Sequence, residues 1–173
     1  SVSIAAGLSL PVLMKYLKCD IPVIRVMPNT PAMVGEGMAA VCSNGLVSRT
    51  QMEDVLAVFR SFGRAEEVAE SLFDIVTAVS GSSPAYVYLF IEAMADAAVA
   101  GGMPRGQAYT FCAQAVAGSA RMVLETGKHP GELKDMVCSP GGTTIDAVME
   151  LEERGMRSAV QNAVTVCMRK SKS

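Results

Sequence analysis

The sequence has little charge of either sign and almost no histidine. Its 173 residues include 15 Lys and Arg, 17 Asp and Glu, one His and no Trp, and the formal net charge is −2. A chain this close to neutral lacks the basic face on which nucleic-acid binding depends. Because half of the residues are hydrophobic and only 18% are charged, disorder is also excluded. The length suits one main domain with an additional part.

Long hydrophobic runs and targeting signals are also missing. The most apolar stretch, residues 85–91, is followed by Glu92 and Asp96, far short of the roughly 20 apolar residues of a membrane span. The first residues, SVSIAAGLSL, have no basic start, so we expect no secretory signal. The five cysteines are widely spaced and form no CxxC pair: Cys19, Cys42, Cys112, Cys138 and Cys167. This spacing predicts buried thiols in a reducing compartment, and hence a cytoplasmic protein.

Common catalytic and metal-binding motifs do not occur. There is no GxSxG, HExxH or P-loop pattern. The single histidine, His129, stands in an HPG turn, where this residue more often ends a turn or helix than acts as a base. With scattered cysteines and no second histidine, we expect no bound metal. The dinucleotide pattern GxGxxG is not met, because Ala40 follows Gly35 and Gly37 where a third glycine is required.

Residues 1–68 predict strands that alternate with helices. Short apolar runs predict strands at residues 2–5, 22–27 and 38–43, with an edge strand at 64–69. Helices are expected at residues 9–18 and from Ser48 to Gly63, with Ser48 and Gln51 forming a capping box. This alternation is typical of the parallel sheet of an α/β domain.

Residues 69–173 predict helices only. The expected helices cover residues 70–79, 84–100, 104–125, 133–137 and 143–154, with a last one that begins at Ser158. The second of these is apolar on nearly all sides, since Glu92 and Asp96 are its only charged residues. A helix that is apolar all round must be buried all round, so we expect a second copy of the chain to pack against this half.

Two loops stand out as candidate binding segments. They are SGSSPAY (residues 80–86) and SPGGTT (residues 139–144), and each leads into a predicted helix. A glycine-rich turn before a helix points unpaired N–H groups at one spot, which suits a carboxylate or phosphate. The same pattern is equally typical of a plain helix cap. Spacing alone leaves both interpretations open.

Three segments together resemble the pyrroline-5-carboxylate reductase family: MPNTPAMVGEG (27–37), SGSSPAY, and HPGELKDMVCSPGGTTIDA (129–147). The resemblance implies the end of an NAD(P)-binding Rossmann domain (residues 1–68). It also implies an all-helical dimerisation domain (residues 69–173), similar to the C-terminal domain of 6-phosphogluconate dehydrogenase. The glycine-rich cofactor loop that the family has in its first half is absent from this chain. Ser83 stands where the family usually has glycine.

The resemblance also implies a reaction and its residues. The family reduces Δ1-pyrroline-5-carboxylate to L-proline with NADPH or NADH. Thr144 matches the position that bonds the ring nitrogen of the substrate, and is therefore the candidate catalytic residue. The substrate-binding candidates are Glu70, Ser139, Gly142, Thr143 and Thr144. The cofactor-binding candidates are Ile4, Ala5, Ala6, Asn29 and Met136.

Two alternatives remain open. The first is that the chain is a helical dimerisation module without activity of its own. The second is another imine or β-hydroxyacid reductase of the same architecture. The β-hydroxyacid enzymes place a catalytic lysine on the helix after the glycine-rich segment, and no lysine occurs between Cys19 and Gly127. Composition does not separate NADH from NADPH, nor a dimer from a larger assembly.

Overall fold

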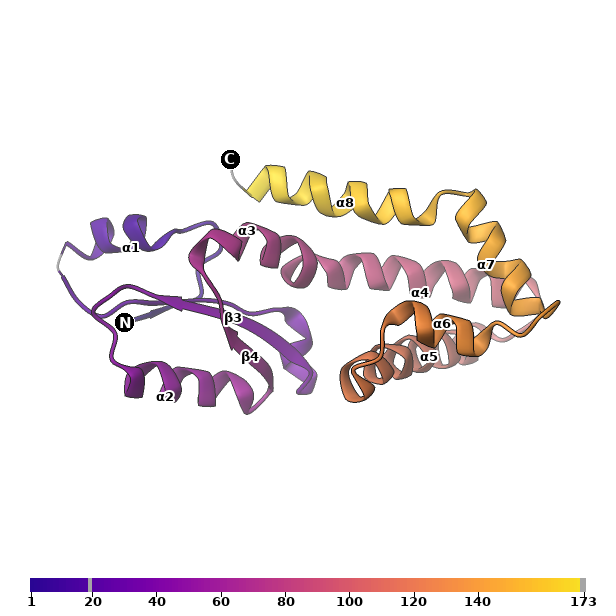
Figure 1. Ribbon diagram of the computed structural model, residues 1–173, viewed down its shortest axis with the longest axis horizontal. Coiled ribbons are helices and arrows are strands. Elements are labelled where there is room, and N and C mark those ends of the chain that lie inside the picture. Colours follow the sequence, from indigo (N-terminus) through magenta and orange to yellow (C-terminus); the bar gives the residue numbers. More distant parts are fainter. Residues whose placement is uncertain (19, 172–173) are drawn as a thin grey trace. The chain divides into compact units, whose positions relative to one another are not determined.

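Figure 1 shows the computed structural model, which describes residues 1–18 and 20–171. The chain divides into two compact units, one formed by Ser1–Ala85 with the residues from Asn162 onward, and one by Tyr86–Gln161. We call them the sheet unit and the helical unit, and each is described by itself. These units are defined by contacts within the chain, whereas the boundary expected after residue 68 separates two domains of a family. That boundary stays a prediction. Cys19, one of the expected free thiols, lies outside the described residues.

The sheet unit is built on four strands in the order β1-β2-β3-β4. The strands are β1 (Val2–Ser3), β2 (Ile24–Met27), β3 (Gly37–Ser43) and β4 (Gly63–Glu67). Its helical segments are α1 (Leu10–Leu17), η1 (Thr30–Val34), α2 (Arg49–Arg60), η2 (Glu70–Leu72), α3 (Phe73–Val76) and η3 (Thr77–Gly81). Strands and helices alternate up to β4, as the sequence predicts, and β4 is an edge strand.

The sheet is mixed, which corrects the expectation of a parallel one. Strands β1 and β2 run parallel, as do β3 and β4, but β2 and β3 are antiparallel with Ile24 opposite Ser43 and Met27 opposite Ala40. Only the short 3₁₀ segment η1 joins β2 to β3. A crossover between parallel strands needs about a dozen residues or more, so this connection forces the chain to turn back.

Both faces of the sheet are covered by helices and form two cores. On one face α2 contributes Met52 and Leu56, which pack on strand side chains such as Val26 and Val41. On the other face α1 contributes Leu10 and Leu13, and α3 contributes Phe73, which is 2% exposed. Figure 1 shows α1 and α2 on opposite sides of the strands. Burial on both faces explains why β2 and β3 read as nearly continuous apolar runs.

The sequence predicts the start of helix α2 correctly but not its end. The predicted capping box is confirmed: Ser48 Oγ accepts from the Gln51 N–H, and Gln51 Oε1 accepts from the Ser48 N–H. The helix ends at Arg60, however, and not at Gly63. Gly63 instead begins β4 at φ +154°, where a Cβ would collide with the backbone of Gly37. Its glycine serves close strand pairing rather than a helix end.

The segment expected as one helix over residues 70–79 changes its pitch along its length. It passes from the 3₁₀ turn η2 through the short α3 into η3, a π-helical turn. The Ser82 N–H closes this turn on the Thr77 carbonyl at 2.8 Å. Single π turns of this kind frequently occur at functional sites.

The helical unit holds the remaining helices. They are α4 (Ser83–Ala100), α5 (Arg105–Thr126), α6 (Pro130–Val137), α7 (Thr143–Glu153) and α8 (Met156–Ser171), where the first turn of α4 and the end of α8 count with the sheet unit. Three predicted starts are wrong by a few residues. Pro104 precedes α5 as its N-cap, and α6 begins at Pro130 because the His129 ring caps it by accepting from the Gly131 N–H. Helix α8 begins at Met156, two residues before Ser158.

The helical unit has a thin core of its own. Among its described residues only Ala95, Ala108 and Cys112 are buried hydrophobics. On α4, by contrast, Tyr88 is 59% and Leu89 67% exposed. None of the described helices is long and apolar enough to cross a membrane. The apolar surface of this unit therefore has no partner within the helical unit.

Candidate functional site

In the sheet unit, the predicted cofactor residues Ile4, Ala5 and Ala6 form the exposed segment that follows β1. Ile4 is 62% exposed, and the segment turns at Gly7, whose φ is +76°. The Ala5 N–H is held by Ser3 Oγ at 3.3 Å. Ligands of open α/β sheets bind beyond the carboxyl ends of the strands, which is where this segment lies.

Glu70 faces inward rather than into open solvent. Its Oε1 accepts from the Leu10 N–H at 2.6 Å and from Arg25 Nη1 at 3.0 Å. The Leu10 N–H is the first of helix α1 and has no acceptor within the helix. Glu70 therefore caps α1 and pairs with Arg25 in the middle of β2.

Arg25 is a site residue that the sequence analysis missed. It is 8% exposed, and its guanidinium lies 4.4 Å from the centre of the Phe73 ring as well as against Glu70. A charged residue in the middle of the apolar run PVIRVM was the available signal. Removing either partner of such a pair leaves a buried charge uncompensated, which makes the pair a fixed element of this end of the unit.

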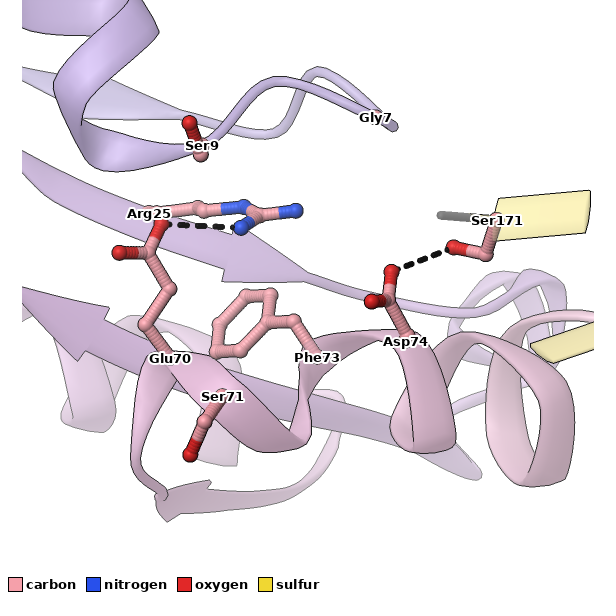
Figure 2. Close-up of a pocket in the computed structure, with 8 residues that line it drawn as sticks. All are labelled: Gly7, Ser9, Arg25, Glu70, Ser71, Phe73, Asp74 and Ser171. Carbon is pink, nitrogen blue, oxygen red and sulfur yellow. Dashed lines mark hydrogen bonds and ion pairs between the residues drawn. The ribbon is translucent and has the colours of Figure 1, made fainter. Parts of the chain in front are cut away.

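A pocket of about 380 Å³ opens beside this ion pair. Figure 2 shows the Arg25 side chain lying over the Phe73 ring, with the Glu70 carboxylate beside it and Asp74 on the far side of the pocket. The Ser171 hydroxyl, from the end of α8, donates to Asp74 Oδ1 at 2.8 Å. The pocket is lined by residues of the sheet unit: Gly7, Ser9, Arg25, Glu70, Ser71, Phe73, Asp74 and Ser171. The structure thus brings Glu70 close to Gly7, which directly follows the predicted cofactor segment.

Asn29 lies just beyond the end of β2 and is fully engaged. Its Oδ1 accepts from the Met38 N–H at 2.9 Å, and its Nδ2 donates to the carbonyl and hydroxyl oxygens of Ser80, each at 3.3 Å. The side chain therefore joins the start of β3 to the first residue of the SGSSPAY loop.

The small residues of the SGSSPAY loop permit close packing, as predicted. A Cβ at Gly81 would lie 2.6 Å from Met27 Cε, so the loop passes directly over the end of β2. Ser83, the departure from the family pattern, begins α4 and its hydroxyl donates to the Val79 carbonyl at 2.7 Å. The serine is accommodated by a bond within its own segment.

In the helical unit, the SPGGTT segment forms a tight turn before α7. The Gly142 N–H donates to the Ser139 carbonyl at 3.0 Å, and Gly141 has φ +66°. A Cβ at Gly142 would collide with the Ser139 hydroxyl. Each glycine is thus required for a different reason, one for its backbone angle and one for space.

This turn presents the start of α7 without a cap. Gly142 stands at the N-cap position, and no side chain of the described residues accepts from the first N–H groups of the helix. Thr143 and Thr144 open the helix, with Thr144 half-buried and Thr143 exposed. The positive end of the helix dipole and uncapped N–H groups make such an end attractive to an anion. The structure brings Ser139, Gly142, Thr143 and Thr144 together, as expected.

Met136 lies on α6, three residues before Ser139, and is 64% exposed. Together with Ser139 to Thr144 it belongs to the helical unit, whereas Ile4 to Ala6, Asn29 and Glu70 belong to the sheet unit. The candidate residues thus form two groups. Among residues 1–18 and 20–171, no group of three or more His, Cys, Asp or Glu side chains is arranged so that it could hold a metal ion.

The thiols differ in burial and chemistry. The four described cysteines are free: Cys42, Cys112, Cys138 and Cys167. Burial, reinforced by the nearby charge of Glu70, raises the pKa of the Cys42 thiol to about 11. Cys42 is therefore neutral and inert at ordinary pH.

Comparison with known proteins places this geometry in context. A family model described as pyrroline-5-carboxylate reductase dimerisation matches residues 70–173. The pyrroline-5-carboxylate reductase of Escherichia coli is 64% identical over 170 residues, which is 98% of this chain and 63% of that protein. That of a Synechocystis strain is 48% identical over the same shares. The chain thus spans 63% of the length of these curated relatives.

Solved structures agree with the sequence relatives. The crystal structure of the Plasmodium falciparum pyrroline carboxylate reductase with NADP bound has a TM-score of 0.92 at 40% identity, covering 99% of this chain and 69% of that one. The Coxiella burnetii enzyme has a TM-score of 0.93 at 34% identity, covering 99% and 64%. A family match over more than half of the chain, joined to these likenesses over nearly all of it, shows that the chain belongs to the pyrroline-5-carboxylate reductase family.

Proposed function

We propose that this chain is the part of a pyrroline-5-carboxylate reductase that carries the substrate site and the dimer interface. The reaction adds a hydride to the C=N carbon of Δ1-pyrroline-5-carboxylate and a proton to its nitrogen, which gives L-proline. The observation that carries the proposal is the uncapped start of α7 behind the SPGGTT turn. It offers the N–H groups that a substrate carboxylate requires.

Thr144 is proposed to bond the ring nitrogen. A protonated cyclic imine is already an electrophile, so the site needs orientation and charge complementarity more than a nucleophile. A hydroxyl in the first turn of α7 lies next to the N–H groups that we assign to the carboxylate. One end of one helix thus contacts two groups of the same small ring, with Ser139 and Thr143 as additional donors.

Glu70 is proposed as a substrate-side residue whose charge is largely offset. Its contact with Arg25 at 3.0 Å reduces the negative potential that it presents to an iminium. Its contribution is therefore to hold α1 and β2 in place beside the pocket, together with Arg25. Pocket and ion pair form one preorganised wall.

NADPH or NADH is proposed as the cofactor, and when bound it supplies the hydride. The exposed segment Ile4–Ala6 carries no charge and suits the uncharged nicotinamide end. Asn29 and Met136 are further candidates on the cofactor side. This chain contains no GxGxxG loop for the pyrophosphate, so the fit covers only the nicotinamide end of the cofactor.

A second copy of the chain is proposed to cover the helical unit. The exposed apolar side chains of α4, with Leu89 at 67%, and of α5, with Phe111 at 66%, would otherwise face water. Contiguous apolar surface of this kind marks protein interfaces. The family model that matches residues 70–173 is itself described as a dimerisation domain.

The reaction is tested with a chimera in which the cofactor-binding half of the Escherichia coli relative precedes Ser1. We expect NADPH oxidation that depends on pyrroline-5-carboxylate. A folded, dimeric chimera that binds NADPH but shows no turnover would refute the proposal. Titrating the chain by itself with NADPH tests the alternative, an inactive dimerisation module, which predicts no binding at micromolar concentrations.

The role of Thr144 is tested by Thr144→Ala in the same chimera. Losing a bond to a charged ring nitrogen costs about 1.5–3 kcal/mol, so kcat/KM for pyrroline-5-carboxylate should fall roughly 10- to 100-fold. The Kd for NADPH should stay within about threefold, since this proposal gives the hydroxyl no cofactor contact. Thr144→Ser keeps the hydroxyl and serves as the matched control. Equal losses in substrate use and cofactor binding would contradict the assignment.

A further inference from the structure

Two asparagines close opposite ends of the antiparallel pair β2–β3. At one end Asn44 follows β3, and its Oδ1 accepts from the N–H groups of Val23 and Leu46 at 3.2 and 3.3 Å. Its Nδ2 donates to the Ile21 carbonyl at 2.9 Å. These contacts join the chain that enters β2 to the chain that leaves β3, and Nδ2 also contacts Met14 Sδ of α1 at 3.5 Å. The Asn44 side chain thus stabilises this end of the strand pair against α1, through partners that precede the SGSSPAY loop in the chain.

At the other end Asn29 makes the same kind of contact to β3 but also reaches a distant segment. Its Oδ1 accepts from the Met38 N–H, which closes this end of the strand pair. Its Nδ2, however, donates to both oxygens of Ser80, 51 residues along the chain. The amide is therefore divided between a local partner and the π turn η3.

The π turn approaches this end of β2 at a second point. Gly81 passes so close to Met27 that a Cβ would lie 2.6 Å from the methionine methyl. Within the turn the Thr77 hydroxyl donates to the Phe73 carbonyl at 2.8 Å, and the Ser82 N–H to the Thr77 carbonyl at 2.8 Å. The turn has hydrogen bonds of its own along the chain, and Ala78 within it is fully buried. At the end of β2, Asn29 bonds it and Met27 contacts it.

We propose that Asn29 is a positioning residue, which sets the π turn and the SGSSPAY loop against the carboxyl end of β2. The inference rests on the proposed function, because this is the end of the sheet at which we place the nicotinamide. In this proposal the Asn29 side chain acts through Ser80, because both N–H groups of its amide are directed at the oxygens of Ser80 and its Oδ1 already accepts from the Met38 N–H. Displacing a positioned segment by about 1 Å is enough to lower a rate about 100-fold.

The matched variants are Asn29→Asp and Asn44→Asp. Each keeps the oxygen that accepts a backbone N–H and replaces the donor by a second oxygen, which faces a carbonyl: that of Ser80 in one case and of Ile21 in the other. The two variants lose the same chemistry at the two ends of one strand pair. Their melting temperatures should fall by similar amounts. Any difference in kinetics then reports the distant partner of Asn29.

In the chimera, Asn29→Asp should lower kcat/KM for pyrroline-5-carboxylate about tenfold or more, whereas Asn44→Asp should change it less than about twofold. Equal kinetic losses in the two variants would overturn the inference. If the unmodified chimera is inactive, the proposed function fails. The inference is then decided by the following measurement on the chain alone.

Amide hydrogen exchange of the chain without cofactor separates an indirect from a direct role. We expect Asn29→Asp to speed exchange at residues 78–83 about tenfold, because the turn loses its bond to the strand. Asn44→Asp should speed exchange only near residues 21–24 and 44–47. Unchanged exchange at 78–83 in Asn29→Asp would overturn the positioning role. A kinetic loss in the chimera would in that case reflect direct contact between Asn29 and the cofactor.

Discussion

The two units of the chain differ in where their apolar side chains go. In the sheet unit, strands and helices bury large residues on both faces of a sheet, including Phe73, Leu56 and Val41 at 2% exposure or less. Among the described residues of the helical unit, the fully buried hydrophobic ones are all small, namely Ala95, Ala108 and Cys112, and many of the larger ones stay exposed. The sheet unit therefore contains its own core. The helical unit has the composition of a core, and in our proposal a second copy of the chain completes it.

Secondary structure does not reveal this difference, but helix periodicity does. Helix α2 has an apolar stripe that faces the sheet, with Met52 and Leu56 buried, and its other positions are mostly polar. Helix α4 has no polar face at all over residues 84–91. A striped helix finds its partner within its own fold, whereas a helix that is apolar all round requires contacts on every side. Three predictions follow the contrast from its strongest consequence to its weakest.

The largest effect is expected from Phe73→Ala in the sheet unit. The ring is 2% exposed, packs with Leu10 and Leu13, and supports the Arg25 guanidinium at 4.4 Å. The free energy of unfolding should fall by about 4 kcal/mol, measured by urea denaturation. Val58→Ala, on the exposed side of α2, should change it by less than about 0.5 kcal/mol. If Phe73→Ala lowered the free energy of unfolding as little as Val58→Ala, the sheet unit would lack a tight core.

The second prediction concerns association through the helical unit. Leu89 and Phe111 are about two-thirds exposed, so Leu89→Glu combined with Phe111→Glu should leave the helices of one chain intact. In a dimer, however, both charges would be buried without partners. We expect the dimer Kd to rise about 100-fold or more, which corresponds to roughly 3 kcal/mol. Sedimentation equilibrium measures this, and circular dichroism checks the helix content.

Val58→Glu is the control for this double variant, because Val58 is 58% exposed but lies in the sheet unit. It should leave the dimer Kd unchanged. A double variant that stays dimeric at the same concentration would place the interface elsewhere and weaken the contrast between the units.

The smallest effect is expected from the Cys42 thiol. Its pKa is raised to about 11 from an ordinary value of 9.0, so the unfolded chain loses this proton first as the pH rises. The folded state is therefore fully favoured below pH 9, and the stability from this group declines between pH 9 and 11. The urea midpoint should drop less steeply over this range in Cys42→Ala than in the unmodified chain. Parallel curves would show that the thiol does not contribute.

Local signals in the sequence located most helices and strands to within a few residues. The capping box at Ser48 and the left-handed end of α5 at Gly127 depend on neighbouring residues only, and the structure has both. The reversal between β2 and β3 was missed, although the short connection between these strands, from Met27 to Gly37, was the available signal. The π turn was missed because its helical residues are ordinary, and only the contacts of Asn29 and Met27 make it distinctive.

The candidate site shows the same limit. The SPGGTT turn was visible in the sequence because adjacent glycine and threonine residues are enough to indicate a turn before a helix. Arg25 was not selected, since its meaning comes from Glu70, which lies 45 residues further along the chain. Asn29 was selected only by resemblance and for a different role. A single sequence does not show which residues far apart in the chain contact each other.

The turn before α7 carries a consequence for how the protein tolerates change. Gly141 needs an unusual backbone angle but has open space around it, whereas Gly142 has an ordinary angle and no space. Asparagine, which accepts the left-handed region more readily than other residues, is the mild replacement at the first position. At the second, even a single methyl group would require the Ser139 hydroxyl to move. Two adjacent glycines thus tolerate different substitutions. A saturation mutagenesis library should therefore retain different residues at the two positions.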